Sequence, residues 1–159
     1  MASISTNVGI VRRTKTKGYN AFMFVISATI NAIVCILDPN WILLDNQSTV
    51  DLFCNCDLLI DIHEVDEELI IHCNAGELMT NKMETLPGYG LVWYAKDAIA
   101  NILSFANVFD MYDIDLVKKE KGTFIIRAPK NDIVFKRHSS GLYYHKVGEQ
   151  LLVEQVCTH

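Results

Sequence analysis

Short apolar runs, closed by polar or glycine-containing turns, recur along most of the chain. Residues Trp41–Leu44 are all large and apolar and lead directly into Asp45. Residues Leu69–Cys73 form a second β-prone run that ends at Asn74-Ala75-Gly76, and Leu91–Tyr94 follow a turn with two glycines. Runs of this length are typical of strands, and four consecutive apolar residues suit a strand buried on both faces, with a short helical segment as the alternative. The pattern predicts a domain built mainly of strands.

The C-terminal part of the chain repeats this pattern. Residues 112–116 and 123–127 are predicted to pair as strands around the polar turn 118–122, and 133–135 and 141–144 to form another hairpin. The acidic stretch 64–68 separates two of the apolar runs and is expected to be a loop.

Asp45 is the first candidate for chemistry because it ends the apolar run that begins at Trp41. A strand end combines a rigid backbone with a side chain that can reach a cleft, which suits positioned acid–base catalysis. The simpler alternative is that Asp45 accepts a hydrogen bond from a backbone amide of its own turn, Asn46-Gln47-Ser48, as an Asx-turn. Both interpretations stay open at this point.

Five blocks along the chain extend the evidence beyond Asp45: WILLDNQSTVDLFCN, ELIIHCNAG, LPGYGLVWY, AIANILSFANV and GLYYHKV. In this order the blocks, which span residues 40–147, resemble the protease segment of copia-type retrotransposon gag-pol polyproteins, a retropepsin-like aspartic protease. The resemblance implies an all-β fold, a closed acid-protease barrel of about six or seven strands. A C-terminal hairpin extension and at most one or two short helices are expected with it.

The resemblance also implies which residues form the site. In that family an apolar strand delivers the catalytic aspartate, a glycine-bearing segment contributes the flap, and an Asn-Leu-Leu-Ser type motif supports the active-site loop. The matching positions are the catalytic Asp45, the active-site loop Asn46, Gln47, Ser48 and Thr49, the flap or substrate-binding turn Pro87, Gly88, Tyr89 and Gly90, and the supporting segment Asn101, Ile102, Leu103 and Ser104. Without the resemblance, an ordinary hairpin corner explains 87–90 and an apolar helix or strand start explains 101–104.

One such chain supplies one aspartate, so the resemblance implies a homodimer in which two copies of Asp45 face each other across a two-fold axis. Two adjacent carboxyl groups share one proton, because ionising both is unfavourable. The ionised member deprotonates a water that attacks a peptide carbonyl, and the protonated member supports the developing oxyanion. The expected substrate is a peptide, above all the chain's own polyprotein, with no metal and no other cofactor.

The chain departs from the family motif directly after Asp45. The family usually has Ser or Thr, then Gly, then Ala, where this chain has Asn46, Gln47 and Ser48. Glycine in such a loop normally marks a backbone angle or a close approach that a side chain would obstruct, so Gln47 requires a relaxed loop or some strain. This departure favours a second hypothesis, a catalytically inactive retroelement remnant that serves only as a structural or dimerising module.

Composition agrees with one small soluble domain. The chain has 159 residues, 50% of them hydrophobic, and a formal net charge of -5. A real core is therefore expected, whereas direct nucleic-acid binding is not, because phosphate neutralisation needs clustered Lys and Arg. The basic residues within 12–17 and 118–121 are expected to be solvated charges.

Five cysteines, an odd number without the density of a disulfide scaffold, favour a reducing compartment. The expected location is the cytoplasm, in a retrotransposon particle. A zinc site formed by Cys54, Cys56, His63, His72 and Cys73 is an alternative use of the thiols. Cysteines separated by one residue point to opposite faces of a strand, which opposes that alternative.

The N-terminal segment allows several interpretations. Residues 21–37 are almost wholly apolar and follow a basic stretch, which is the pattern of a signal anchor or short membrane span. The competing interpretations are a linker or packed segment that leads into Trp41 or contacts a dimer partner, and a remnant of upstream polyprotein. The predicted division is 1–39 for this segment, 40–117 for the protease domain, 118–147 for a hairpin region resembling the protease–integrase junction, and 148–159 for a tail.

Overall fold

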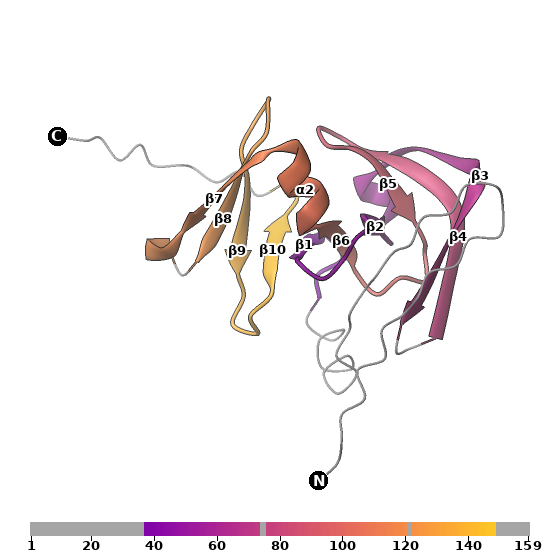
Figure 1. Cartoon of the computed structure of the whole chain (residues 1–159), viewed down its shortest axis with the longest axis horizontal. Helices are drawn as coiled ribbons and strands as arrows, with labels where there is room; N and C mark the ends of the chain where they lie inside the picture. The colour runs from indigo at the N-terminus through magenta and orange to yellow at the C-terminus, as the bar shows by residue number, and fades with distance from the viewer. Residues whose placement is uncertain (1–36, 74–75, 121, 149–159) are drawn as a thin grey trace, which may run out of the picture.

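The computed structural model describes residues 37–73, 76–120 and 122–148, and the predictions for 1–36 and 149–159 fall outside these ranges. Within the described ranges the fold is all-β, as predicted, with one short α-helix (Figure 1). The strands are β1 (Trp41–Asp45), β2 (Leu52–Phe53), β3 (Ile60–Cys73), β4 (Gly76–Leu86), β5 (Gly90–Tyr94), β6 (Asn101–Ser104), β7 (Asp113–Val117), β8 (Thr123–Arg127), β9 (Ile133–Arg137) and β10 (Tyr143–Lys146). The helix is α2 (Phe105–Met111), and two 3-10 turns are η1 (Cys56–Leu58) and η2 (Lys118–Glu120).

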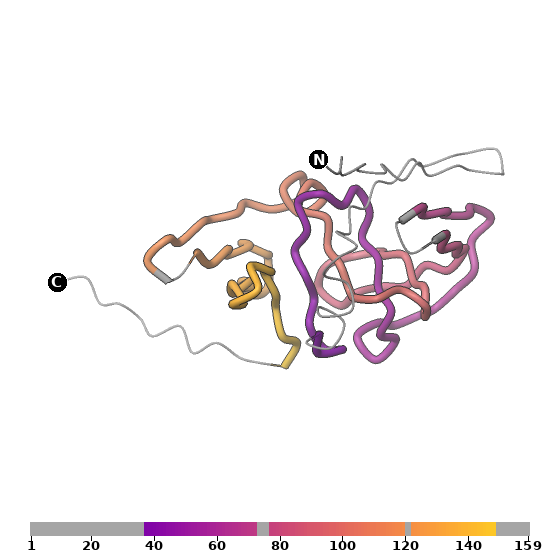
Figure 2. The backbone as a smooth tube through the Cα atoms, turned by 90° about the horizontal axis from the view of Figure 1, so that it is seen from below, coloured from indigo at the N-terminus to yellow at the C-terminus, as the bar shows by residue number. Residues whose placement is uncertain are grey.

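The strands form one ten-stranded sheet in the order β3-β4-β5-β2-β6-β1-β10-β9-β8-β7. Figures 1 and 2 show β3 to β5 on one side of the central strands β1 and β6, and β7 to β9 on the other. The predicted closure into a barrel is wrong, because β3 and β7 are the two ends of this strand order. The reason is β10, which pairs antiparallel with β1 and extends the sheet outward through β9 and β8 to β7.

The central strands are buried on both faces, as predicted for the run before Asp45. Ile42 and Leu44 of β1 belong to one apolar cluster and Leu43 to the other. β6, which runs parallel to β1, divides in the same way between Ile102 and Leu103. Because neighbouring side chains on a strand point to opposite faces, two separate hydrophobic clusters pack against the same strands, one on each face. Each buried side chain of this size stabilises the fold by roughly 1.5–3 kcal/mol.

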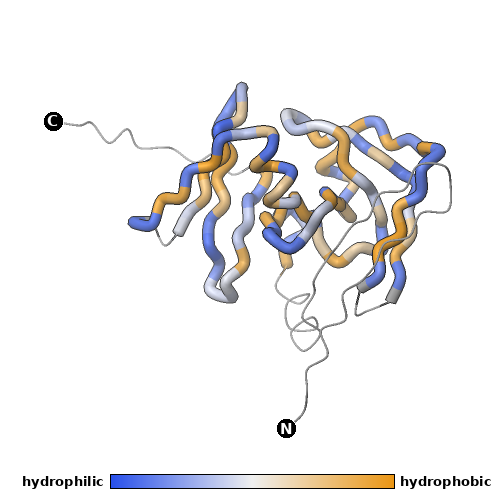
Figure 3. The backbone as a smooth tube through the Cα atoms, viewed as in Figure 1, coloured by the Kyte–Doolittle hydropathy of each residue, from blue (hydrophilic) through white to orange (hydrophobic). Residues whose placement is uncertain are grey.

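Different elements cover the two faces. Leu69 and Ile71 of β3 pack in the cluster that contains Leu43. Val108 of α2 packs with Ile126 and Phe135, from β8 and β9, in the other cluster. Figure 3 shows hydrophobic stretches running along the strands and hydrophilic ones at the exposed turns. The end of β1 is therefore held rigidly between two packed layers.

The acidic stretch 64–68 is not a loop, contrary to the expectation. It lies inside β3, which pairs with β4 along a long antiparallel hairpin. The pairing shifts register between Ile60 and His63 and again between Glu64 and Leu69. Such irregularities are typical of β-bulges, which bend a strand and re-aim its side chains.

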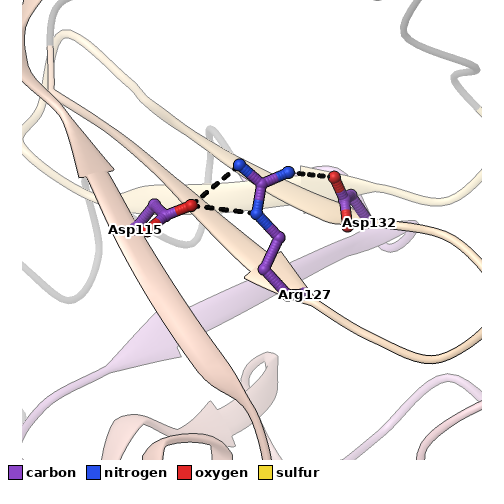
Figure 4. Close-up of polar contacts among 3 residues, drawn as sticks. All are labelled: Asp115, Arg127 and Asp132. Carbon is purple, nitrogen blue, oxygen red and sulfur yellow. Dashed lines mark hydrogen bonds and ion pairs between the residues drawn. The ribbon is translucent and has the colours of Figure 1, made fainter.

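An exposed arginine on β8 forms ion pairs with aspartates on or beside the two neighbouring strands, β7 and β9. Arg127 at the end of β8 donates from Nε and Nη2 to Oδ2 of Asp115 on β7, at 2.9 and 2.7 Å (Figure 4). The third nitrogen of its guanidinium, Nη1, pairs with Asp132, next to the start of β9. Exposed ion pairs contribute little stability by themselves, and this one links three consecutive strands that already pair through their backbones.

No helix in the described ranges is long and apolar enough to cross a membrane. The predicted membrane or linker segment 21–37 lies outside those ranges except for its last residue. Leu37 packs against the same apolar cluster as Leu43 and Trp41.

Candidate functional site

Asp45 is the last residue of β1 and is half-buried. Its Oδ1 accepts a hydrogen bond from the backbone N–H of Gln47 at 2.9 Å, so the Asx-turn considered as the simpler alternative is present. Burial raises the pKa of the Asp45 carboxyl, and the Gln47 hydrogen bond opposes part of that rise. One oxygen of the carboxylate is thus engaged in its turn, which does not prevent the other from acting on a substrate.

The loop after Asp45 is anchored at Ser48. Asn46, Gln47 and Thr49 are exposed, whereas Ser48 is 2% exposed. Its hydroxyl donates to the carbonyl of Val50 at 2.7 Å. Its own carbonyl accepts a hydrogen bond from the Ser104 hydroxyl at 2.6 Å. The small side chain at position 48 therefore lets the loop pack closely on β6.

Gln47 occupies the position of the family's glycine without backbone strain. Asp61, with φ of 64°, is the single non-glycine residue of the described ranges with positive φ. Gln47 therefore does not need the left-handed conformation that favours glycine. Of the two possibilities set out from the sequence, the relaxed loop is the one observed.

The segment 101–104 lies beside β1 and fastens its two ends. The Asn101 side chain, 1% exposed, donates to the carbonyls of Pro39 and Trp41 at 2.8 and 2.9 Å. Its Oδ1 accepts from the backbone N–H groups of Cys54 and Asn55. Ser104 pairs with Asp45 in the parallel ladder and also caps α2. The structure thus brings Asp45, Ser48 and Ser104 together, in an arrangement suited to the supporting role predicted for the segment.

Asp51 is a residue that the sequence interpretation missed. It is 8% exposed and accepts three hydrogen bonds, from Ser104 N at 2.7 Å, from Asn107 Nδ2 at 3.0 Å and from the Tyr89 hydroxyl at 3.0 Å. Burial raises the pKa of Asp51, and the hydrogen bonds from Asn107, Ser104 and Tyr89 oppose the rise. A carboxylate between the apolar Val50 and Leu52 was the available signal in the sequence.

The turn predicted as a flap is held by contacts of Tyr89 in this structure. Pro87 to Tyr89 link β4 to β5, and Gly88 and Gly90 have positive φ, of 80° and 146°. The Tyr89 hydroxyl donates to Asp51 and its ring contacts Tyr112 at the end of α2. Burial and the nearby Asp51 charge raise the pKa of Tyr89. In this structure the turn is held to Asp51 through Tyr89. Its role as a flap stays a prediction.

A cleft of about 290 Å³ opens beside this network. Its lining residues come from the loop after Asp45, the β3–β4 hairpin, β5 and α2: Thr49, Val50, Asp51, Glu67, Met83, Leu91, Trp93 and Asn107. Of the sequence-predicted site residues, Thr49 lines this cleft and Asp45 does not.

Glu84 is a second buried carboxyl that the sequence did not single out. It is 0% exposed, and neither carboxylate oxygen has a hydrogen-bond partner within the described ranges. Burial raises its pKa, which the charges of His63 and Lys82 oppose in part. An unpartnered buried carboxyl is costly when ionised, so Glu84 bears on the stability of the fold.

The cysteine alternative gains no support from the geometry. Cys54 and Cys56 are free thiols. Across 37–73, 76–120 and 122–148, no group of three or more His, Cys, Asp or Glu residues is arranged to hold a metal ion.

Comparison of the chain with protein-family models, with curated proteins and with solved structures finds no match. The resemblance to copia-type proteases therefore depends on the sequence blocks alone.

Proposed function

We propose that this chain is one subunit of a homodimeric aspartic endopeptidase of the copia type, with Asp45 of each copy forming the catalytic pair. The observation that carries the proposal is the half-buried carboxyl of Asp45, with its raised pKa, at the end of a strand packed on both faces. A carboxyl that tends to keep its proton is suited to a pair that shares one. The expected setting is a cytoplasmic retrotransposon particle.

In the proposed dimer, the two Asp45 carboxyl groups titrate as a unit with one shared proton. The ionised member removes a proton from water, and the resulting hydroxide adds to the substrate's peptide carbonyl. The protonated member donates a hydrogen bond to the oxyanion. Proton transfer to the amide nitrogen then lets the carbon–nitrogen bond break, which yields a carboxylic acid and an amine.

The hydrogen bonds around Ser104 support this proposal because they fix the loop that carries the acid. Ser104 pairs with Asp45 in the ladder and holds the Ser48 carbonyl through its hydroxyl. Its backbone N–H is in turn held by Asp51. Catalytic groups need positions accurate to a fraction of an ångström, and a loop held by β6 and α2 meets that need.

A retropepsin-like fold is part of the same proposal. The order of the five sequence blocks and the parallel pairing of β1 with β6 at Asp45 support it. The open sheet within one chain means that a second copy would have to complete the substrate cleft. The long β3–β4 hairpin, which contributes Glu67 and Met83 to the cleft, is a better candidate than the tethered turn at 87–90 for covering bound substrate.

The test is cleavage of an upstream polyprotein fused to the full chain. The wild type is compared with Asp45→Asn and with Asp97→Asn, a matched change at an exposed carboxylate before β6. We expect Asp45→Asn to abolish cleavage and Asp97→Asn to retain it, with active material sedimenting as a dimer. Adding excess Asp45→Asn chain to the wild type is expected to lower the cleavage activity of the wild type, because a mixed dimer lacks one of the two acids. Equal cleavage by wild type and Asp45→Asn would remove Asp45 from the mechanism.

The alternative is a catalytically inactive module, and one observation favours it. Gln47 donates its N–H to Asp45 Oδ1, in a turn whose Asn46-Gln47 sequence departs from the family's Ser/Thr-Gly. A folded, dimeric wild-type chain with no cleavage activity would support this alternative.

A further inference from the structure

The cleft beside Asp51 combines a buried negative charge with an apolar lining. Asp51 is 8% exposed and lines the cleft, and each of its three hydrogen-bond donors, Ser104, Asn107 and Tyr89, is uncharged. Buried charges in proteins are normally paired with an opposite charge. No Lys, Arg or His belongs to the described residues that line the cleft.

A second carboxylate faces the same cleft from another element. Glu67 of β3 is part of its lining, so acidic side chains from two different elements border one concave space. Each carboxylate lowers the electrostatic potential in the cleft, and partial shielding from water strengthens this effect. A cation that enters the cleft would supply the charge that the network around Asp51 lacks.

The rest of the lining suits an alkyl chain. Trp93, which is 7% exposed, and Val50 are buried apolar residues at the cleft, and Met83 and Leu91 add further apolar surface. Long basic side chains bury their methylene stems on apolar surface and keep the charged end at polar groups. At about 290 Å³, the cleft lies at the lower end of the size range of ligand pockets and suits a single side chain.

We propose that this cleft binds a lysine or arginine side chain of an extended peptide, with Asp51 and Glu67 receiving the positive charge and Trp93 and Met83 contacting the stem. As a statement about substrate, the proposal rests on the function proposed above. Thr49 and Val50 line the cleft and follow Asp45 closely in the chain, so the basic residue would lie near the bond to be cleaved. The cleft would then determine specificity.

The test measures peptide binding separately from cleavage. The full-length Asp45→Asn chain is titrated with fluorescently labelled, blocked octapeptides in which one arginine is moved along an alanine–valine sequence. Each peptide has a partner with citrulline, which has nearly the same shape but no charge. At one or two positions we expect the arginine peptide to bind about tenfold more tightly or more, the usual effect of a hydrogen bond to a charged group. Added salt is expected to reduce the ratio.

Two variants locate the preference. Glu67→Gln is expected to lower the arginine-to-citrulline ratio at least threefold, whereas Glu68→Gln, its neighbour on β3 and absent from the cleft lining, is expected to leave it unchanged. Asp51→Asn is expected to remove most of the preference, provided that circular dichroism shows the native fold. Equal binding of arginine and citrulline peptides at every position overturns the proposal, as does a preference unaffected by Glu67→Gln.

The two proposals fail in different ways. Cleavage that depends on Asp45 but is indifferent to basic residues leaves the protease assignment intact and overturns the specificity. A preference for arginine that depends on Glu67, in a chain that never cleaves, supports the cleft as a binding site and overturns the enzymatic assignment.

Discussion

The two ends of the loop between β1 and β2 carry similar carboxylates in different surroundings. Asp45 is half-buried and accepts one backbone hydrogen bond. Asp51 is 8% exposed and accepts three, from β6, α2 and the turn at Tyr89. A carboxylate surrounded by donors holds elements together and adds its charge to the neighbouring cleft, whereas one with unused acceptor capacity can form a new hydrogen bond to a reacting group. The number and origin of the partners therefore separate the candidate catalytic acid from the structural one.

The largest expected effect follows from the three donors at Asp51. Asp51→Ala should lower the free energy of unfolding by about 3 kcal/mol or more, because each buried donor left without an acceptor costs about 1–3 kcal/mol. Asp45→Ala should cost about 1 kcal/mol, the usual value of one hydrogen bond. Urea unfolding followed by tryptophan fluorescence, at matched protein concentration, measures both. Equal losses would contradict the assignment of Asp51 as the structural member of the pair.

Removing one donor tests the same network more gently. Tyr89→Phe should lower the free energy of unfolding by about 1 kcal/mol, since Asp51 keeps its bonds from Ser104 and Asn107. It should also speed hydrogen exchange at the Tyr89 amide, which donates to the Leu86 carbonyl within the turn. Tyr112→Phe is the matched control, because its ring contacts Tyr89 outside the network. Unchanged exchange in Tyr89→Phe would mean that the turn is held by its glycines and packing alone.

These comparisons indicate what the sequence can predict. Apolar runs predicted most strands, and they also predicted that residues 42–44 are buried on both faces. The spacing and the length of an apolar run depend directly on which side chains are buried. The open sheet was not predictable, since the pairing of β10 with β1 joins residues about a hundred positions apart and leaves no local signal. The acidic segment of β3 was missed for a related reason: the strand continues through it because its flanks, at Glu64 and at Leu69, pair with β4, which overrides composition.

The site shows the same division. Local motifs made Asp45, its turn and the segment ending at Ser104 candidates, because each signal lies in a few consecutive residues. Asp51 and Glu84 were missed because their surroundings are made by side chains from distant elements. Asp51 can be recognised as part of a network only through its hydrogen bonds with Tyr89 and Asn107, and neither residue is near Asp51 in the sequence.

A third carboxyl, Glu84, sharpens the comparison because it is buried and has no hydrogen-bond partner among the residues that the structure describes. Its pKa is raised by burial, so the stability it contributes is fully present below its pKa in the unfolded chain and is lost as pH rises through the folded-state pKa. Glu84→Gln cannot ionise and should be more stable than wild type by about 1 kcal/mol at neutral pH, with the difference vanishing near pH 4. Urea unfolding at both pH values, with the exposed Glu64→Gln as control, measures this. A Glu84→Gln variant that is less stable than wild type at neutral pH would mean that the carboxylate has a partner in solution.

The smallest expected effect tests whether the Asp45 loop is relaxed. Gln47 lacks the positive φ that favours glycine, so Gln47→Gly should lower the free energy of unfolding by about 0.5–1 kcal/mol through the added entropy of the unfolded chain. Asp61 has φ of 64° and is exposed, so Asp61→Gly should relieve strain and raise stability by about 0.5–1 kcal/mol. Thermal and urea unfolding of the two variants side by side should give changes of opposite sign. A stabilising Gln47→Gly would instead show that the glutamine strains the loop after Asp45, which would favour the proposed inactive remnant over the proposed protease.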